Sequence, residues 1–405
     1  MDLHHALKRN RIIGVSLIVL AVAILIFVAY INSARRHLPV IFSSREILEN
    51  TWLKYKTAYL EEGTLRTLDK QQNNITTSEG QSYTMLRSVW MDDRTTFDTS
   101  FKWTQDNLKH KDDALHAWLF GARQNGSYGI LTDRGGQNSA TDAESDIAVS
   151  LLFAYHRWKD VAYLNEAKAI ISDIWDKEVV QVNGKPVLAA DDLETNAPST
   201  IVVNPSYFSP YAYRMFAEVD KDHNWNGVVD SSYDILERSM KAKLDKGNTA
   251  LLIPDWIRIN KKTGEITAMN SATLTTNFGY DALRTPWRLS LDWHWYGEER
   301  AKKLLDMMSF FSREWTDQGR VATVYGHDGS VVTNAEAPAV YGGLIGYFML
   351  SDSKNAKNVY EQRLEVLYNP DTNSWKNVLG YYDDNWTWFG IGLYNNLLPN
   401  LAKGE

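Results

Sequence analysis

Apolar residues recur at helix spacing along nearly the whole chain from residue 44 onward, and this pattern constrains the fold more than any other feature. In one stretch, for example, Ile147, Leu151 and Trp158 fall on a single helical face. A lone apolar stripe must pack against others, so the pattern predicts an all-α domain. The predicted helices are 44–60, 79–91, 94–109, 142–158, 160–176, 207–220, 229–244, 279–295, 297–316, 334–351, 354–368 and 386–400.

The number and spacing of these helices favour a ring of helix pairs. A long solenoid of comparable size would show a clear repeat motif, which the sequence lacks. Gly/Asn/Asp-rich stretches such as 121–140 and 183–204 predict loops, and 251–259 is typical of a strand. No Pro/Ser/Gly-rich break interrupts residues 46–405, which we therefore expect to form one domain.

Composition excludes several classes of protein. The 405 residues carry 43 Lys+Arg against 50 Asp+Glu, a net charge of −7, with the basic residues scattered, which argues against nucleic-acid binding. The absence of Cys excludes disulfide scaffolds, thiol catalysis and Cys-based zinc sites. Fifteen Trp and 21 Tyr favour carbohydrate binding, since flat rings stack on sugars, although the same rings also fill helical cores.

An uncharged apolar run near the N-terminus predicts a membrane anchor. It covers residues 12–31, about the 20 residues that cross a bilayer as a helix. Basic residues at positions 8, 9 and 11 place the preceding end in the cytoplasm by the positive-inside rule. We expect 1–11 to be cytoplasmic, 12–34 to be a single transmembrane helix, 35–45 to be a linker, and the domain at 46–405 to lie outside the cell.

The alternative for this segment is a cleaved signal peptide. The apolar run is longer than the usual core of a signal peptide. Cleavage after Ala34 would also place Asn32 where a small residue is preferred. Both points favour the uncleaved anchor.

Three acidic residues, Glu79, Asp142 and Asp281, stand where predicted helices begin. Thr76 and Glu79 have the spacing of a capping box, as do Thr141 and Glu144, and the helix dipole favours acids in a first turn. Helix capping is therefore sufficient to explain their positions, and a functional role requires further support.

Six short blocks supply that support, because together and in this order they resemble glycoside hydrolase family 8. The resemblance spans about residues 45–400. The blocks are Ser78–Tyr83 with Met85, Ala140–Asp142 with Asp146–Ala148, Asn204–Phe208 with Pro210, Pro254–Trp256, Tyr280–Arg284 with Pro286–Arg288, and Tyr382–Asn385 with Phe389–Gly390.

The resemblance implies a fold and an activity. The fold is an (α/α)6 barrel of six inner and six outer helices with a few short strands in loops, in agreement with the helices predicted above. The implied activity is endo-acting, inverting hydrolysis of a β-linked polysaccharide, such as β-glucan, chitosan or a bacterial exopolysaccharide. It assigns Glu79 as general acid, Asp281 as general base, and Asp142 as the residue that holds the sugar at the cleavage site.

These roles place opposite demands on the two catalytic carboxyls. The acid must be protonated to act, yet a helix N-terminus lowers the pKa of a carboxyl group. We therefore expect Glu79 to be partly buried or close to another carboxylate such as Asp142, so that its pKa is raised. Arg284, three residues after Asp281, either orients the base or forms an ordinary ion pair within its helix.

Aromatic residues in or beside the blocks are candidates for stacking on sugar rings. The candidates are Tyr83, Trp118, Tyr207, Trp256, Trp287 and Trp386, of which Tyr83, Trp118, Tyr207 and Trp287 are the predicted substrate-binding residues. Tyr207 is also a candidate to hydrogen-bond the attacking water or the base. Core packing explains each of them equally well. Tyr207 and Trp118 are the stronger candidates because both follow loop-like sequence.

Nothing in the sequence calls for a metal or a cofactor. Residues 222–230 match the beginning of a calcium loop, but position twelve is Tyr233 instead of the bidentate Glu. A turn between helices with Asn or Asp capping is the better interpretation. The nine His residues include no pair with metal-binding spacing.

Three functions remain open from the sequence. The first is the anchored, outward-facing hydrolase, with a polysaccharide substrate and exopolysaccharide synthesis machinery as a candidate partner. The second is a catalytically idle glycan-binding barrel, which would have no need to keep both Glu79 and Asp281. The third is an anchored structural protein, for which a broad apolar exterior patch is expected.

Overall fold

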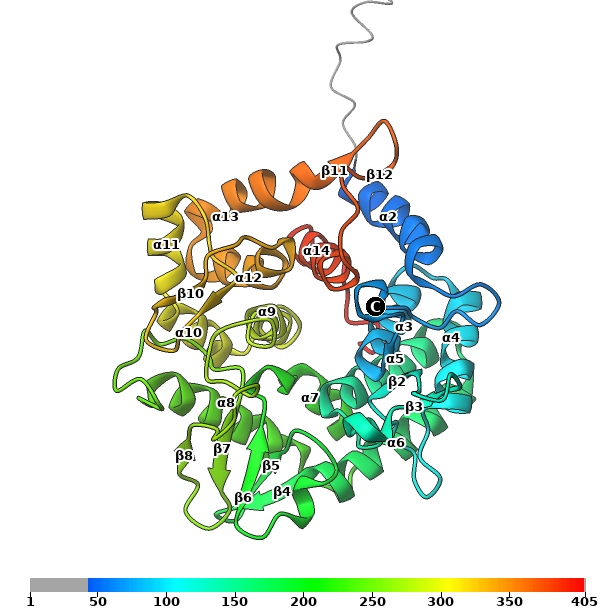
Figure 1. Ribbon diagram of the computed structural model, residues 1–405, viewed down its shortest axis with the longest axis horizontal. Helices are drawn as coiled ribbons and strands as arrows, with labels where there is room; N and C mark the ends of the chain where they lie inside the picture. Colours follow the sequence, from blue (N-terminus) through cyan, green and yellow to red (C-terminus); the bar gives the residue numbers. More distant parts are fainter. Residues whose placement is uncertain (1–42, 404–405) are drawn as a thin grey trace, which may run out of the picture. The chain divides into compact units, whose positions relative to one another are not determined.

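The computed structural model describes residues 43–403, which form a mostly helical domain with short strands (Figure 1). The predicted transmembrane helix at 12–34 lies outside the described residues. Within 43–403, no helix is both long enough and apolar enough to cross a bilayer. The helices are α2 (Ser44–Tyr59), α3 (Ser78–Trp90), α4 (Arg94–Asn107), α5 (Thr141–Trp158), α6 (Val161–Glu178), α7 (Pro210–Val219), α8 (Trp225–Lys241), α9 (Arg284–Tyr296), α10 (Glu299–Met307), α11 (Phe310–Gln318), α12 (Pro338–Ser351), α13 (Ser353–Val359) and α14 (Tyr381–Tyr394).

Six of these helices form an inner ring. Helices α3, α5, α7, α9, α12 and α14 pack in succession around the centre in Figure 1. Contacts from α14 back to α3 close the ring: Arg87 pairs with Asp384 at 2.9 Å, and the rings of Tyr83 and Phe389 lie 5.4 Å apart. A second layer lies outside, with α4, α6, α8, α10, α13 and α2 packed on α3, α5, α7, α9, α12 and α14 respectively.

Burial explains why some helices are inner and others outer. Every residue of α5 from Thr141 to Ala154 is buried, and most of these residues are apolar or small. In α4, by contrast, only Thr96, Phe97, Ser100, Trp103 and Thr104 are buried, which is a single stripe. A helix buried on all sides belongs in the centre, and an amphipathic one belongs outside.

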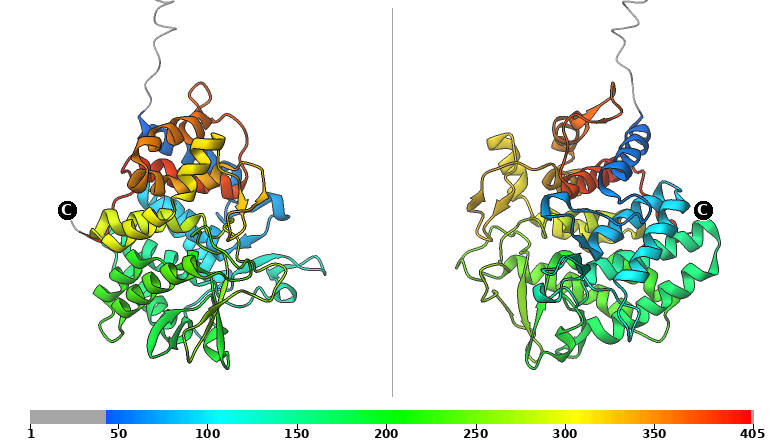
Figure 2. Two further views of the ribbon diagram at one scale, coloured as in Figure 1. Left: turned by 90° about the vertical axis from the view of Figure 1, so that its left-hand side faces the viewer. Right: turned by 45° about the vertical axis from the view of Figure 1, so that its right-hand side comes forward.

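Short antiparallel strands lie in the loops between helices. They form three-stranded sheets β1-β2-β3 and β6-β7-β8 and the hairpins β4-β5, β9-β10 and β11-β12. Figure 2 shows the domain from two further sides. The strands are β1 (Thr76–Thr77), β2 (Leu119–Ala122), β3 (Tyr128–Ile130), β4 (Val179–Val182), β5 (Lys185–Leu188), β6 (Thr200–Val203), β7 (Ile257–Asn260), β8 (Ile266–Thr267), β9 (Val324–Tyr325), β10 (Val331–Thr333), β11 (Tyr368–Asn369) and β12 (Ser374–Trp375).

The predicted helices are found, but several of their limits differ; the predicted helix 279–295, for example, begins only at Arg284. The stretch 297–316 is two helices, because the backbone leaves helical geometry at Met308. The last helix begins at Tyr381, five residues before its apolar stripe, and ends at Tyr394. Helix α13 ends at Val359 and continues as a π turn. In the predicted strand 251–259 only the end is β-structure, where β7 begins at Ile257.

The segment at 222–230 combines the end of a capped turn between α7 and α8 with the first residues of α8, which begins at Trp225. Asn224 caps α8 by accepting a hydrogen bond from the Gly227 amide at 3.0 Å. Asp220 accepts from the indole of Trp225 at 2.8 Å, and its carboxylate also lies 2.8 Å from His223 Nδ1. The capping interpretation is confirmed. Among residues 43–403, no cluster of three or more His, Asp or Glu side chains is arranged to hold a metal ion.

Candidate active site

The candidate site lies where the N-terminal ends of inner helices meet. Glu79 is in the first turn of α3, Asp142 is in the first turn of α5, and Asp281 lies in the turn that precedes α9. Residues far apart in sequence are thereby brought within reach of one side chain, the buried guanidinium of Arg284 at the start of α9.

Arg284 binds all three acids. Its Nη1 donates to Glu79 Oε2 and to Asp142 Oδ2, each at 2.7 Å. Its Nη2 donates to Asp281 Oδ1 at 2.7 Å and to Ser206 Oγ at 2.8 Å. The predicted ion pair between Arg284 and Asp281 is therefore present at the start of α9. Asp281 is one of four side-chain partners of the guanidinium. The two predicted catalytic carboxyls, Glu79 and Asp281, accept hydrogen bonds from different nitrogens of one planar guanidinium, which fixes their positions relative to each other.

Helix capping does not account for these acids. The residue that caps α3 is Thr77, whose hydroxyl accepts from the Gly80 amide, and α5 has no side-chain cap. Glu144 does not reach back to Thr141; it accepts hydrogen bonds from the backbone amide of His116 at 2.8 Å. The capping-box interpretation is wrong at both positions, because the side chains turn toward partners elsewhere in the chain: Glu79 toward α9 and α14, and Glu144 toward the loop residue His116.

Glu79 has the environment predicted for a proton donor. Burial raises its pKa to about 7, and the charges of Asp142 and Asp281 add to that rise, against the opposing effect of Arg284. Tyr381, at the start of α14, donates to Glu79 Oε1 at 3.2 Å. The prediction that Glu79 is partly buried and close to another carboxylate is confirmed.

Asp142 offers an unused acceptor. Its side chain is buried, and this loss of contact with water is the main reason why the pKa of Asp142 is raised. The oxygen Oδ2 accepts a hydrogen bond from Arg284. The other oxygen, Oδ1, is buried and has no hydrogen-bond partner. A buried acceptor without a donor is unfavourable, so this atom is suited to a hydroxyl group of a bound ligand.

Asp281 is held by an aromatic donor on its far side. Its Oδ2 accepts from the indole Nε1 of Trp256 at 2.9 Å. Tyr207 packs edge-on against Trp256, with ring centres 5.8 Å apart, and lies over the Arg284 guanidinium at 5.2 Å. Tyr207 therefore belongs to the site, beside the predicted base.

The other predicted aromatics differ in placement. Trp118 is half-buried beside the start of α3, where its carbonyl accepts from the Ser78 amide at 3.0 Å and its indole donates to Gly135 O at 2.8 Å. Tyr83 is buried against Trp386, and its hydroxyl has no partner.

Trp287 lies in the core. It is 2% exposed, and its indole donates to Phe389 O at 3.1 Å. A ring enclosed in this way has no open face for a sugar, so stacking by Trp287 is contradicted and core packing accounts for it.

The sequence did not predict the polar contacts that four residues make in or behind the site. Ser206, Asp255 and Trp256 lie inside the blocks noted above, and Tyr381 directly precedes one of them. Their position in or beside the blocks is the sequence feature that could have indicated a role in the site. The partner of each one lies on a different element and is invisible to local spacing.

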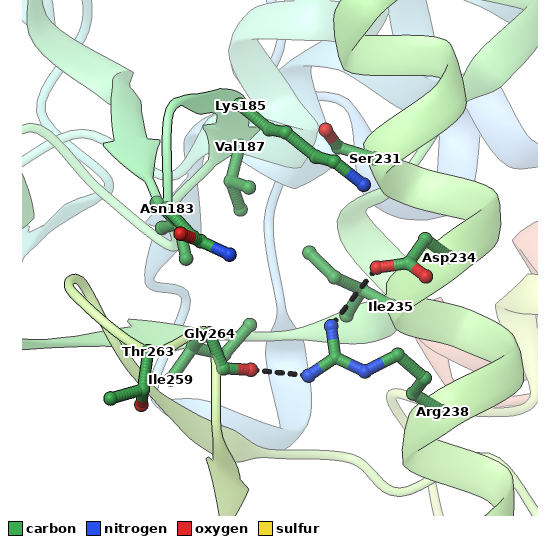
Figure 3. Close-up of a pocket in the computed structure, with 11 residues that line it drawn as sticks. Asn183, Lys185, Val187, Ser231, Asp234, Ile235, Arg238, Ile259, Thr263 and Gly264 are labelled. Atoms are coloured by element: carbon green, nitrogen blue, oxygen red, sulfur yellow. Dashed lines mark hydrogen bonds and ion pairs between the residues drawn. The ribbon is translucent and has the colours of Figure 1, made fainter.

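A separate cavity of about 390 Å³ lies among the β4-β5 hairpin, α8 and the β7-β8 hairpin (Figure 3). In it Arg238 donates to Asp234 at 2.9 Å and to the carbonyl of Gly264. None of the eight predicted site residues, all of them within 43–403, lines this cavity. The carboxylate network around Arg284 is thus the candidate for chemistry.

Comparison with known families decides the class of the protein. The family model for Glycosyl hydrolases family 8 matches residues 28–392. The chain belongs to glycoside hydrolase family 8. The family 8 resemblance and the prediction of a glycoside hydrolase are thereby confirmed.

Individual relatives agree with the family. Over 341 residues the chain is 29% identical to Endoglucanase 2 of Ruminiclostridium josui, covering 80% of this chain and 67% of that protein. It is 30% identical over 305 residues to Endoglucanase A of Acetivibrio thermocellus, covering 74% of this chain but 58% of the relative. The chain therefore spans about two thirds or less of the length of these two relatives.

Solved structures of two glucanases share the fold. The endo-1,4-D-glucanase from Vibrio fischeri ES114 superposes with a TM-score of 0.69 at 26% identity, covering 85% of this chain and 94% of that one. The β-1,3-1,4-glucanase from Paenibacillus sp. X4 gives 0.71 at 24% identity, covering 88% and 94%. The helical class predicted from the apolar pattern is confirmed.

Proposed function

We propose that this family 8 enzyme is an endo-acting β-glucanase that cleaves its polymer with inversion. The observation that carries the proposal is the pair of carboxyls, Glu79 and Asp281, fixed on one guanidinium, with the pKa of Glu79 raised to about 7. The relatives are named as glucanases, which supports β-linked glucan as the substrate class. We further infer that the two helix rings are the (α/α)6 barrel of the family.

The proposed reaction is a single displacement. Glu79 protonates the departing glycosidic oxygen while Asp281 takes a proton from water attacking the opposite face of the sugar. Inverting hydrolases keep their carboxyls roughly 6.5–9.5 Å apart to admit that water. A guanidinium between Glu79 and Asp281 is a spacer suited to that requirement.

The remaining site residues act on the substrate in this proposal. Asp142 accepts a hydrogen bond from a sugar hydroxyl through its free Oδ1, which holds the ring at the cleavage point. Tyr207 lies beside the base and contacts the sugar or the water. Trp118 remains a predicted substrate contact, whereas the Tyr83 ring is enclosed like that of Trp287 and keeps only its unpartnered hydroxyl for such a contact.

The N-terminal segment determines where the enzyme acts. We propose that residues 12–34 anchor the chain in the cell membrane with the catalytic domain outside. An anchored hydrolase would cut polymer close to its own cell, and machinery that makes an exopolysaccharide is then a candidate partner. Protease accessibility of the domain in intact cells, compared with lysed cells, tests the orientation; protection in intact cells contradicts it.

Reducing-end release tests the activity. The full-length chain is assayed on β-glucan, chitosan, xylan and an acetylated amino-sugar exopolysaccharide, beside Glu79→Gln and Asp281→Asn. We expect activity on β-glucan that each substitution reduces by at least about 1,000-fold. Binding without cleavage by the unaltered protein would instead favour the idle glycan-binding barrel.

A further inference from the structure

The turn that carries Asp281 is held from behind by a second carboxylate. Asp255 Oδ1 accepts hydrogen bonds from the backbone amides of Gly279 at 3.1 Å and of Ala282 at 2.7 Å. These two amides bracket Asp281 in the chain. Asp255 is 8% exposed and contacts neither Arg284 nor any other side chain of the network by hydrogen bond, so the network itself does not explain its presence.

The fit between this carboxylate and the turn is tight. A methyl group added at Gly279 would lie 2.7 Å from Asp255 Oδ2, which is closer than atoms normally approach. The carboxylate thus occupies the space that a side chain at position 279 would need. The turn has little freedom to move toward Asp255, and the two hydrogen bonds oppose movement away from it.

The segment that carries Asp255 is itself fixed to the chain just before the turn. The Asp255 amide donates to Asn277 O at 2.7 Å, and the Trp256 amide donates to Thr275 O at 3.0 Å. Trp256 then donates its indole hydrogen to Asp281 Oδ2. Consecutive residues therefore hold the backbone around Asp281 and its carboxylate at the same time.

We infer that Asp255 is a positioning residue for the general base: by fixing the turn 279–282 it aims the Asp281 carboxylate at the attacking water. The inference rests on the proposed role of Asp281 as base. Asp255 does not touch the substrate in this account. Its contribution is orientation, and displacement of a catalytic group by about 1 Å can cost about 100-fold in rate.

The acceptor role of Asp255 does not require a negative charge. Burial, followed by the nearby charge of Asp281, raises the pKa of Asp255 well above its usual range. An amide oxygen in the same position accepts from the same two backbone amides. Asparagine is therefore the substitution that keeps the geometry, and alanine is the one that removes it.

Steady-state kinetics of Asp255→Asn and Asp255→Ala on a soluble β-glucan oligosaccharide test the inference. We expect kcat of Asp255→Ala to fall about 30- to 100-fold with KM within about twofold, because orientation of the base matters in the transition state. Asp255→Asn is expected to keep at least about a third of kcat. Gly279→Ala, which displaces the same turn from the other side, is expected to lose kcat in the same way.

Asp292→Ala is the matched control, since Asp292 is a buried Asp of α9 bound to Arg214 and Tyr233. It should lower the melting temperature without the selective loss of kcat. Asp255→Ala with kcat within threefold of the unaltered protein, or Asp255→Asn as impaired as Asp255→Ala, would overturn the inference. Crystal structures give a readout independent of activity: the Asp281 carboxylate must be displaced in Asp255→Ala, and an unmoved carboxylate contradicts the proposal even if the glucanase activity itself proves wrong.

Discussion

At the scale of single residues, Arg284 organises the chemistry. Its planar fork makes hydrogen bonds of 2.7–2.8 Å with Glu79, Asp142, Asp281 and Ser206, which come from four separate parts of the chain. An ammonium group cannot reproduce this geometry, because it is a compact point charge on a flexible stem. The residue is therefore sensitive to a substitution that preserves its charge.

Arg284→Lys tests that sensitivity. We expect kcat/KM to fall by at least about 100-fold while the protein stays folded, because the carboxyls lose their fixed spacing. Kinetics beside circular dichroism provide the measurement. Activity within about fivefold of the unaltered protein would show that a positive charge at position 284 is sufficient and that the planar guanidinium geometry is not required.

The pKa of Glu79 predicts a pH dependence. A general acid works in its protonated form, so kcat/KM should fall as pH rises through about 7, the raised pKa of Glu79. The negative charge of Asp142 contributes to that rise, after burial. Asp142→Asn should therefore shift the alkaline limb of the profile to lower pH. A limb unchanged in Asp142→Asn, or one near the ordinary pKa of Glu, would contradict this assignment.

The site could be predicted from sequence only as far as its motifs extended. Glu79, Asp142, Asp281 and Arg284 were predictable because they lie in recognisable blocks, although the positions of the three acids alone favoured helix capping. Trp287 was misassigned because a block does not distinguish a ring that faces a substrate from one that faces the core. Tyr381 and Asp255 depend on contacts between elements distant in sequence, which periodicity does not encode.

At the scale of elements, close contact between inner helices depends on glycine. In α12, a methyl group at Gly342 would lie 2.0 Å from Trp386 O of α14, and one at Gly343 would lie 2.1 Å from Leu283 O, just before α9. Gly390 of α14 faces Gly342 directly. The absence of side chains at these positions lets α12 approach both neighbours and keeps the start of α9, and with it Arg284, in place.

Gly342→Ala separates packing from helix propensity. Alanine favours an isolated helix by about 1 kcal/mol over glycine. The contact with α14 should outweigh this, giving a net loss of about 1–3 kcal/mol in the free energy of unfolding because the helices must move apart. Urea denaturation measures the sign directly. A stabilised variant would show that the α12-α14 contact is looser than described.

Element limits were predictable where an apolar stripe and its helix coincide. They were less so for α14, where the first turn holds Asp383 and Asp384 and the apolar stripe begins only at Trp386. The side chains of this turn bind partners on other helices: Asp384 pairs with Arg87 of α3, and Asp383 accepts from the Ala339 amide at the start of α12. Tertiary contacts, not local pattern, set that helix start.

At the scale of the whole domain, the ring must close between its first and last inner helices. The buried pair Arg87–Asp384 lies at this junction, with the guanidinium 4.1 Å from the Tyr55 ring centre and 4.9 Å from that of Trp388. Asp384 also accepts from the indole of Trp375 at 2.6 Å. Helices from both ends of the described domain therefore meet around one guanidinium.

Arg87→Met should weaken this closure. Removing one partner leaves Asp384 buried without its charge partner, which typically costs about 3–5 kcal/mol. The double variant Arg87→Met, Asp384→Leu should recover much of the loss, because no uncompensated charge then remains. Denaturation of the single and double variants gives the coupling energy. Additive losses would show that the pair does not act as a unit.

The central claim is that Glu79 and Asp281 cleave a β-linked glucan by single displacement, and the anomeric form of the new reducing end tests it most directly. Proton NMR during the first minutes of hydrolysis of a β-1,4-glucan oligosaccharide distinguishes the α anomer from the β anomer before mutarotation mixes them. We predict that the α anomer appears first, and that neither anomer appears with Glu79→Gln or Asp281→Asn. Initial release of the β anomer, or undiminished release by either variant, would contradict the account.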